Sequence, residues 1–287
     1  MPAAASPYWN RTIAFATMHQ KQRAVAKPFG RWLGSSVVVP NGIDTDRFGT
    51  FTGEVPRGGT MLDAARAKAK AAMAATGLPF GLGSEGSFGP DPAVPFVPRG
   101  IELLLFIDGQ REFEVVEILQ ARRTNYQHRD YHSGDDIGAF LRNVDFPRHA
   151  IVVTLDPPCD AFSPIKGILT WVALETALTA AADRAAGRRI QIATDMRAHV
   201  NPTRMAAIRA ASTRLARRLA TLCLACGTPG FGVVGVKRGA PCAWCYAPTD
   251  VAVAEVRGCA KCDFKTTTRL KRAPDYVDPG SCRHCNP

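Results

Sequence analysis

The sequence lacks any segment that would export the chain or hold it in a membrane. Its first residues, Met1 to Arg11, contain no basic stretch followed by an apolar run, so we expect no signal peptide. No apolar run approaches the roughly 18 residues that a membrane-spanning helix needs. These absences lead us to expect a cytoplasmic protein that does not contact a membrane.

Cysteine is nearly absent from the first 222 residues, where Cys159 stands alone and no motif around it marks a nucleophile. The other eight of the nine cysteines follow after that point. Cysteines in a reducing compartment bind metal more often than they form disulfides. With 46% hydrophobic and 21% charged residues, the 287-residue chain has the composition of a globular protein. It has room for one large domain, or for a medium one with a small appendage.

Acidic residues are scarce at the C-terminal end. From Arg197 onward the chain has 15 Lys and Arg against 5 Asp and Glu, whereas the first 196 residues have 21 and 20. A basic end of this kind is typical of nucleic-acid binding. Eight thiolates with two Zn²⁺ ions would add a charge of about −4 and leave about +6, which weakens that interpretation.

The first 200 residues alternate between short apolar runs and helical patterns, which indicates a mixed α/β domain. The clearest helix is Met61–Thr76, with Thr60 as its N-cap and Gly77 just past its end. A second helix is expected from about Gly167 to Ala186. The expected strands are Thr12–Ala16, Ser36–Val39, Phe80–Gly83, Glu102–Ile107, Phe113–Ile118, Ala150–Thr154 and Ile190–Ala193.

We expect three parts in the chain. Residues 10–200 form the α/β domain, with a mixed sheet flanked by helices. Residues 201–222 form a bridging helix that starts at Asn201-Pro202, a good N-cap followed by a proline in the first turn. We expect its apolar stripe to pack on the α/β domain, and nucleic-acid binding by its arginines is the alternative. Residues 223–287 form a small β-rich zinc-ribbon module.

The eight late cysteines form four Cys-x-x-Cys pairs. Each pair can place two sulfurs at adjacent corners of a tetrahedron, so two pairs complete a four-cysteine zinc site with no position for a substrate. The sequence therefore predicts two structural zinc ions. Sequential pairing is the simplest, a crossed arrangement fits the gaps nearly as well, and an iron–sulfur cluster is the competing cofactor. The pairs are Cys223/Cys226, Cys242/Cys245, Cys259/Cys262 and Cys282/Cys285.

Short β-prone runs lie between the cysteine pairs, at Phe231–Val236, Val251–Val256 and Phe264–Leu270. They predict the strands of zinc-ribbon hairpins. A module of this size cannot hold a core without metal. The zinc ions are therefore expected to be structural.

Polar and glycine-rich motifs follow the strands expected in the N-terminal part. α/β sheets usually bind ligands outside the carboxyl ends of their strands. Carboxylates near lysines are what a Mg²⁺–phosphate site requires, because the hard metal takes oxygen ligands and the cations bind phosphate. The candidate residues are Thr17, His19, Lys21, Asp63, Lys68 and Glu85.

Most of these residues also have a purely structural interpretation. Asp63 stands three residues after Thr60, as in an ordinary capping box. Lys68, on an alanine-rich helix, would be merely solvated, and His19 would form a loop hydrogen bond. Glu85 is harder to explain in this way, since a carboxylate within Gly-Ser-Glu-Gly-Ser after an apolar strand serves neither packing nor a turn.

A second constellation is the segment 194–204, Thr-Asp-Met-Arg-Ala-His-Val-Asn-Pro-Thr-Arg. It follows a strand and opens a helix, whose N-terminal amides can bind an anion. Arg197 and Arg204 would add bidentate phosphate contacts. The alternative is an N-cap with surface arginines.

Nearly the whole chain resembles an uncharacterised bacterial family with a zinc tail. That family carries Asp-Thr-Asp-Arg-Phe-Gly-Thr-Phe, Ser-Glu-Gly-Ser-Phe-Gly-Pro and Asp-Met-Arg-Ala-His-x-Asn-Pro-Thr-Arg-Met, which stand here at 44–51, 84–90 and 195–205. This resemblance implies no activity. More remotely, residues 12–90 are similar to inosine triphosphate pyrophosphatases and their relatives, which remove damaged or non-canonical nucleotides.

The second resemblance implies roles for the candidate residues. Thr17 and Lys21 match the family's Ala-Thr-x-Asn-x-x-Lys motif, although the gap is one residue shorter and His19 replaces the asparagine. Asp63 and Lys68 match its Glu-Asn-Ala-x-x-Lys-Ala motif, and a Glu-Gly pair stands where the family has Asp-Asp-Ser-Gly. The implied roles are a Mg²⁺ ligand for Asp63, a metal ligand or water-activating base for Glu85, and phosphate contacts for Lys21 and Lys68.

Two functions follow from the sequence. The leading expectation is Mg²⁺-dependent hydrolysis of a nucleoside triphosphate or a related phosphorylated small molecule, with a structural zinc module. The alternative is a non-catalytic protein whose zinc ribbons and basic helix bind nucleic acid or a protein partner. Its weakness is that the tail has only five aromatic residues, few for a base-stacking platform. They are Phe231, Trp244, Tyr246, Phe264 and Tyr276.

Overall fold

The fold is that of a computed structural model, which describes residues 6–45, 59–121, 123–160 and 162–287. Asp46 and the rest of the motif up to residue 51 lie outside the described residues. The chain divides within helix α5 (Pro202–Leu219), at Leu215/Ala216, into two compact units, called here the α/β unit and the zinc unit.

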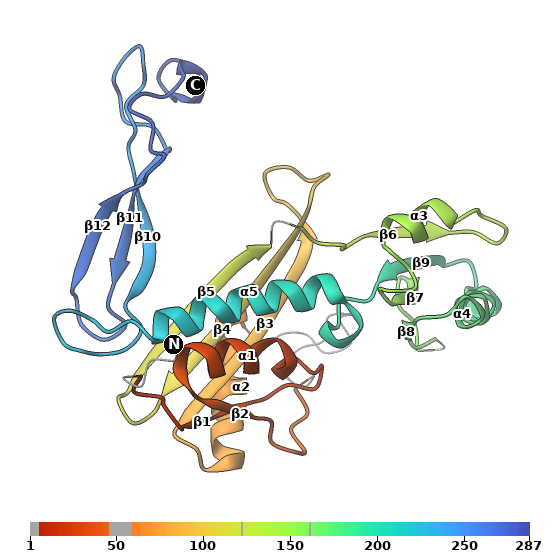
Figure 1. The fold of residues 1–287 in the computed structure, drawn as a ribbon. Coiled ribbons are helices and arrows are strands. Elements are labelled where there is room, and N and C mark those ends of the chain that lie inside the picture. The colour runs from red at the N-terminus through yellow and green to blue at the C-terminus, as the bar shows by residue number, and fades with distance from the viewer. Residues whose placement is uncertain (1–5, 46–58, 122, 161) are drawn as a thin grey trace. The chain divides into compact units, whose positions relative to one another are not determined.

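The α/β unit begins with a mixed five-stranded sheet in the order β2-β1-β3-β4-β5 (Figure 1). β1 runs parallel to β2 and β3, and β3, β4 and β5 pair antiparallel. The expected mixed sheet flanked by helices is confirmed. The elements are β1 Thr12–Phe15, α1 Gln22–Leu33, β2 Ser36–Val38, α2 Met61–Thr76, β3 Phe80–Pro90, β4 Pro98–Asp108 and β5 Phe113–Ala121.

The strand order places a topological switch point beside β1. The chain leaves β1 through α1 towards β2 on one side, and returns through α2 to β3 on the other. Ligands of open α/β sheets bind outside the carboxyl ends of the strands at such a point. The loop after β1, which carries Thr17, His19 and Lys21, therefore lies where this fold type binds ligands.

Helix α2 has the predicted bounds, and its capping box is confirmed. Thr60 Oγ1 accepts a hydrogen bond from the Asp63 N–H, the Asp63 carboxylate accepts one from the Thr60 N–H, and Gly77 ends the helix in the left-handed region. The helix packs on the sheet through small side chains, with Ala65 and Ala69 beside Leu103 and Leu105 of β4. The side chains on this face of the helix are small, so the helix and the sheet lie close together.

Two glycines of β3, Gly81 and Gly83, are required by this close approach. A Cβ at Gly83 would overlap the main chain of Ala65, and one at Gly81 would meet Met73 and the Ala69 carbonyl. The sequence led us to expect a loop at Gly83–Pro90, and that expectation was wrong, because β3 continues to Pro90. These glycines make room for a helix instead of ending the strand.

Helix α1 was not predicted, because Pro28 and Gly30 interrupt it. Its Val25, Phe29 and Leu33 are fully buried at a spacing of four residues, which holds the helix on the sheet despite the proline. In Figure 1, α1 and α5 lie in front of the sheet, and α2 lies behind it.

The rest of the α/β unit forms a four-stranded antiparallel sheet in the order β6-β9-β7-β8. Its core includes Ile151, Val153 and Leu155 of β7, packed with Leu174 and Leu178 of α4. The helix expected at Gly167–Ala186 is shorter, because the chain is still a strand at Ile165–Ile168 and Thr170 caps the helix. The elements are β6 His128–Tyr131, α3 Gly138–Asn143, β7 Ile151–Asp156, β8 Ile165–Ile168, α4 Trp171–Arg184, β9 Arg189–Thr194 and α5 Pro202–Leu219.

The zinc unit contains one antiparallel sheet in the order β10-β11-β12. Its strands, β10 Gly232–Arg238, β11 Ala252–Gly258 and β12 Lys265–Arg269, fall within two residues of the predicted runs. The described part of the chain has no helix that is both long and apolar enough to span a bilayer.

Candidate functional site

Two groups of four cysteines in the zinc unit could each hold a metal ion. Within each group, all four sulfur atoms lie within 4.8 Å of one another. The closest Sγ–Sγ distances are 3.6 Å for Cys226 and Cys259 in the first group, and 3.6 Å for Cys245 and Cys282 in the second. The groups are Cys223, Cys226, Cys259 and Cys262, and Cys242, Cys245, Cys282 and Cys285.

These distances fit zinc and exclude disulfides. Zn–S bonds of about 2.3 Å in a tetrahedron place the sulfurs about 3.8 Å apart, whereas a disulfide would bring them to about 2.05 Å. Four thiolates also saturate a tetrahedral ion, so each group fits a structural zinc site. Of the two arrangements that the sequence left open, the structure has the crossed one, in which the first pair joins the third and the second joins the fourth.

The pairs adopt the turn that presents both sulfurs to one ion. The Lys261 and Cys262 N–H groups donate to Cys259 Sγ over 3.3 and 3.4 Å, and the Trp244 N–H donates to Cys242 Sγ over 3.4 Å. Gly227 (φ 69°) and Tyr246 (φ 59°), each following the second cysteine of a pair, take the left-handed conformation that closes the turn. These backbone donors orient the sulfurs and share their negative charge.

The two metal centres lie at opposite ends of the sheet. The first joins the chain before β10 to the β11–β12 turn, and the second joins the β10–β11 connection to the chain after β12. Each centre therefore ties together segments that are 33 to 43 residues apart in the sequence. The two edge strands bury few large side chains, so metal ions bound at the two centres would supply much of what holds the sheet.

The α/β unit contains a buried cluster of charged side chains, called here the polar cluster: Lys21, Lys68, Glu85, Glu102 and Arg204. Each is less than 10% exposed. Lys68 Nζ pairs with Glu85 Oε1, and Arg204 Nε donates to Glu102 Oε1 over 2.7 Å. The charges of the other four side chains all act on Lys21, so the five residues form one electrostatic group.

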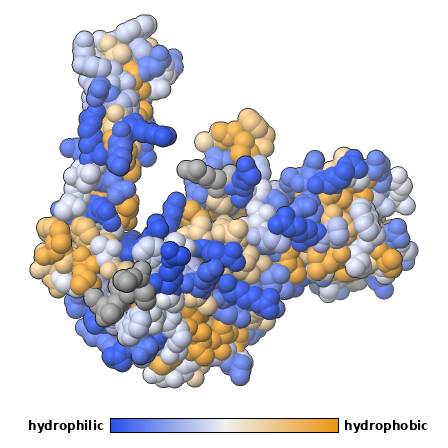
Figure 2. All heavy atoms as spheres, in the orientation of Figure 1, coloured by the Kyte–Doolittle hydropathy of each residue, from blue (hydrophilic) through white to orange (hydrophobic). Residues whose placement is uncertain are grey.

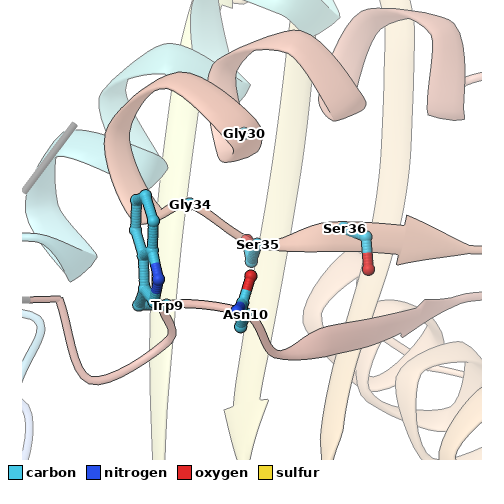
Figure 3. A pocket seen from close by; sticks show the side chains of 6 residues that line it. All are labelled: Trp9, Asn10, Gly30, Gly34, Ser35 and Ser36. Carbon is cyan, nitrogen blue, oxygen red and sulfur yellow. The ribbon is translucent and has the colours of Figure 1, made fainter. Parts of the chain in front are cut away.

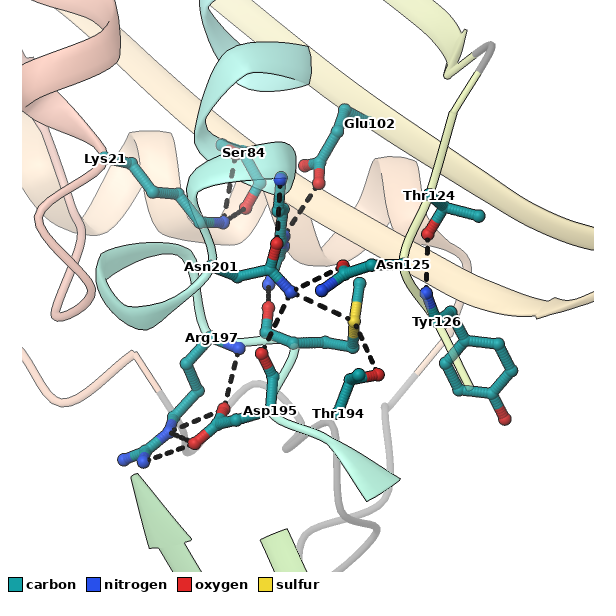
Figure 4. Close-up of polar contacts among 12 residues, drawn as sticks. Lys21, Ser84, Glu102, Thr124, Asn125, Tyr126, Thr194, Asp195, Arg197 and Asn201 are labelled. Carbon is teal, nitrogen blue, oxygen red and sulfur yellow. Dashed lines mark hydrogen bonds and ion pairs between the residues drawn. The ribbon is translucent and has the colours of Figure 1, made fainter. Parts of the chain in front are cut away.

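Lys21 is the cation of this group that has no carboxylate partner among the described residues. Its Nζ donates to Ser84 Oγ over 3.1 Å and lies 3.5 Å from the Ser84 carbonyl oxygen (Figure 4). Burial and the charge of Arg204 lower the pKa of Lys21 to about 7, against the raising effect of Glu102. With three cations and two carboxylates, the polar cluster carries one positive charge in excess when Lys21 is protonated.

His19 joins the cationic side of this group. Its ring stacks on His199 with 5.3 Å between ring centroids, and the backbone N–H of His19 donates to Thr17 Oγ1 over 3.3 Å. Burial, followed by the charges of Lys21, His199, Arg204 and Arg197, lowers the pKa of His19 to about 3. His19 is therefore a neutral imidazole that can donate or accept a hydrogen bond.

The start of α5 brings the second constellation to the polar cluster. The expected N-cap is confirmed, because Asn201 Oδ1 accepts a hydrogen bond from the Arg204 N–H over 2.9 Å. Asn201 Nδ2 donates to the Asp195 carbonyl and to Asn125 Oδ1, both over 3.0 Å (Figure 4). Asn201 is fully buried, so this network fixes where Arg204 enters the sheet face.

Both arginines expected to bind phosphate are engaged by carboxylates. Arg197 forms a bidentate pair with Asp195, at 3.1 Å for Nε–Oδ1 and 2.6 Å for Nη2–Oδ2. Arg204 pairs with Glu102, donates to the Met196 carbonyl, and lies 4.9 Å over the Phe88 ring. The guanidinium groups thus have structural partners, and they contribute charge to the surroundings of Lys21.

The structure places the six candidate residues of the N-terminal part in different surroundings. Thr17, His19 and Lys21 lie on the sheet face that also receives Arg204, whereas Lys68 and Glu85 meet between α2 and β3. Asp63 pairs with Thr60 and Arg66 at the exposed start of α2, where the Thr60 hydrogen bonds lower its pKa. Its geometry is that of the capping-box alternative, and it does not contact the polar cluster.

Sequence reasoning missed Glu102 and Ser84. Glu102 is the first residue of the strand expected at Glu102–Ile107, and it was interpreted only as part of that strand. A charged residue at an inward position of such a strand is the signal that could have identified it, since carboxylates are almost never fully buried unless paired. Its Oε2 is buried without a hydrogen-bond partner among the described residues.

A surface pocket lies elsewhere in the α/β unit, between the end of α1 and the chain before β1. Figure 3 shows Trp9 against Gly34, with Asn10 facing Ser35. Gly34 is required there, because a side chain at this left-handed residue would overlap the indole ring. The pocket has no ionisable lining residue, so we assign the chemistry to the polar cluster.

Comparison with known proteins gives one match. A family model described as "Domain of unknown function (DUF6671)" matches residues 68–287. This range begins inside α2 and includes Lys68, Glu85, Glu102, Arg204 and all eight paired cysteines, whereas Thr17, His19 and Lys21 precede it. No curated protein and no solved structure matches the chain significantly.

Proposed function

The chain belongs to the DUF6671 family, whose function is unknown, and from its site we propose that the α/β unit is a Mg²⁺-dependent hydrolase of a nucleoside triphosphate or a related phosphorylated small molecule. The zinc unit is then a structural appendage. The resemblance of residues 12–90 to inosine triphosphate pyrophosphatases favours the same class of substrate.

The proposal depends above all on Lys21. A buried cation without a counter-ion is unfavourable, and its depressed pKa marks that cost. Structural lysines are normally paired when they are buried, as Lys68 is with Glu85. An anionic oxygen beside Lys21 would complete the charge balance, and strongly perturbed pKa values in such places are typical of functional sites.

The position of Lys21 favours a phosphate group in particular. Lys21 follows β1 at the switch point of the sheet, the place where α/β folds bind ligands. The neutral His19 ring lies beside it as a further hydrogen-bonding group. In this proposal Lys21 and His19 contact the phosphate directly, and Thr17 holds their loop. The positive charges of Arg197 and Arg204 attract the anion while both arginines stay paired with their carboxylates.

The carboxylates near Lys21 fit Mg²⁺. Glu102 Oε2 is buried without a hydrogen-bond partner among the described residues, and carboxylate oxygens are the ligands that this metal takes. We therefore assign Glu102, on the sheet face of Lys21, as the residue that would hold Mg²⁺, and leave Asp63 as a helix cap. Glu85 lies on the opposite face of the sheet, beside Lys68. When bound, the metal would neutralise the phosphate charge.

The resemblance to the pyrophosphatases assigns the role of base to Glu85, and we keep that assignment as part of the proposal. A water molecule adds its oxygen to phosphorus, the phosphoanhydride bond breaks, pyrophosphate leaves, and Glu85 accepts the proton of the water. Lys68 beside it holds the carboxylate in place through their ion pair.

We expect Mg²⁺-dependent release of pyrophosphate from at least one member of a panel of canonical and damaged nucleoside triphosphates. Glu85→Gln should lower kcat by about 10²–10⁴-fold, the usual contribution of a general base. Glu114→Gln is a matched control, because Glu114 pairs with Arg66 of α2, the helix that also carries Lys68, the partner of Glu85. Absence of turnover on every substrate, or equal rates for the Glu85 variant and the wild type, would exclude the assignment.

Lys21→Met separates a functional lysine from a structural one. Methionine keeps the length of the side chain and removes the charge, so the variant should lose phosphate binding by at least tenfold while its free energy of unfolding stays equal or rises. Calorimetric titration with inorganic pyrophosphate and urea unfolding measure the two quantities. A variant that is strongly destabilised would show that Lys21 serves the fold.

The pH dependence follows from the same residue. Above about pH 7 the folded Lys21 has lost its proton, whereas the unfolded side chain keeps it up to its ordinary pKa of 10.5. Unfolding therefore takes up a proton in this window, and the free energy of unfolding of the wild type should rise with pH there relative to Lys21→Met. Sulfate, which stays a dianion throughout, should bind more weakly as the pH rises above 7.

A further inference from the structure

The two faces of the sheet in the zinc unit differ in charge. Ala254 of β11 lies opposite Lys237 of β10 and Arg269 of β12, and Gly258 lies opposite Lys265. Residues that face each other across antiparallel strands share a face, so the three cations lie on one side of the sheet. The sheet has one acidic residue, Glu255, and alternation places it on the other side, where it pairs with Arg257.

The basic side of the sheet forms a shallow trough. On this side the central strand β11 carries Ala252, Ala254, Val256 and Gly258, all shorter than the cations that the two edge strands carry. An extended polyanion can lie along such a strand, with Lys237 on one side and Lys265 and Arg269 on the other. Figure 2 shows strongly hydrophilic side chains beside apolar ones along this sheet.

Exposed aromatic rings lie at the second metal centre, beyond the sheet end that carries Lys237 and Arg269. Trp244, within the Cys242–Cys245 turn, is 75% exposed, and Tyr246 and Tyr276 are 67% and 57% exposed. The two tyrosine rings pack edge to face with 6.0 Å between centroids, so they hold each other in place. A large aromatic ring left in water on a metal-fixed turn has no role in a core, and it offers a flat face to a base.

We propose that this basic side, together with Trp244, Tyr246 and Tyr276, binds single-stranded nucleic acid. The cations track the phosphates, and the rings stack on unpaired bases. Arg269 also pairs with Asp275 at 2.6 Å, but both side chains are well exposed, so a phosphate can replace that carboxylate at little cost. The few aromatic residues of the tail are no obstacle, because three of the five are gathered at this end in water.

The test uses the full chain with zinc present. Fluorescence anisotropy measures binding of labelled 12-nucleotide single strands of DNA and RNA, and of a duplex, at about 50 and 200 mM salt. The variants are the triple Lys237→Ala, Lys265→Ala, Arg269→Ala and the single Trp244→Ala, with Trp244→Phe to restore a ring. The triple Lys27→Ala, Lys70→Ala, Arg184→Ala removes the same number of exposed charges from the α/β unit as a control.

We expect single strands to bind more tightly than the duplex. The triple variant of Lys237, Lys265 and Arg269, called here the ribbon triple, should lower the slope of log K against log salt by about 2, because each lost contact with a single strand contributes roughly 0.7. Trp244→Ala should weaken binding about tenfold, and Trp244→Phe should restore most of it. The control triple should bind as the wild type does.

Three results would overturn the proposal. One is that single strands do not bind at low salt. Another is that the control triple weakens binding as much as the ribbon triple, which would mean that only net charge matters. The third is that polyglutamate competes as well as the oligonucleotide and Trp244→Ala has no effect, which would identify the surface as a site for an acidic protein.

Discussion

Two double substitutions of cysteine by serine should leave different amounts of zinc on the chain. In the crossed arrangement Cys223 and Cys259 are ligands of the same ion, so Cys223→Ser with Cys259→Ser should reduce the content from two zinc ions per chain to one. Cys223 and Cys242 are ligands of different ions, so Cys223→Ser with Cys242→Ser should remove both. Sequential pairing predicts the reverse pattern. Metal analysis after gel filtration distinguishes the two.

Loss of both ions should unfold the zinc unit. Structural zinc contributes about 10–16 kcal/mol of apparent binding free energy, which is as large as the whole stability of a typical domain, about 5–15 kcal/mol. We expect the β10–β12 amides to exchange freely with solvent after treatment with a chelator, while those of the α/β unit stay protected. Cys159→Ser is the control and should keep two ions. Equal zinc contents in the two double variants would contradict the crossed arrangement.

The zinc centres show which part of a metal site a sequence can specify. The Cys-x-x-Cys spacing identifies the eight ligands, because each pair is made by a local turn of four residues. The partner of each pair is set by the antiparallel sheet, which brings the β11–β12 turn back to the chain before β10. The gaps between the cysteine pairs have similar lengths, so they do not indicate which pairs the sheet brings together.

The α/β unit shows the same division between local and long-range information. The capping box of α2 and the N-cap of α5 were predictable because each involves residues within three positions of one another. Glu85 was expected in a loop, since its glycines resemble chain breakers. Gly83 in fact lets α2 approach β3 at Ala65, 18 residues earlier, and Gly86 makes room for the Arg204 side chain. Arg197 and Asp195 are only two residues apart, yet the sequence did not indicate that they form an ion pair.

Removal of the Arg204 guanidinium is the second change from which we expect a large effect. Arg204→Met leaves the Glu102 carboxylate, 1% exposed, without its counter-ion in a place where one of its oxygens already has no hydrogen-bond partner among the described residues. Breaking a buried ion pair on one side costs about 3–5 kcal/mol. For a unit of this size we expect the melting temperature to fall by about 10 °C. Methionine keeps contact with Phe88, so the loss measures charge more than packing.

The double variant Arg204→Met, Glu102→Leu should recover most of that loss, because it removes the unpaired charge together with its partner. Arg214→Met is the matched control on the same helix. Arg214 is well exposed and lies 3.9 Å from Glu117, so its removal should cost at most about 1 kcal/mol. Urea unfolding measures the free energy of unfolding of all three variants, and an unchanged m-value shows that the transitions can be compared. If Arg204→Met and Arg214→Met lose the same small amount, water reaches Glu102 and the buried cluster is not the charged site from which we infer an anion-binding function.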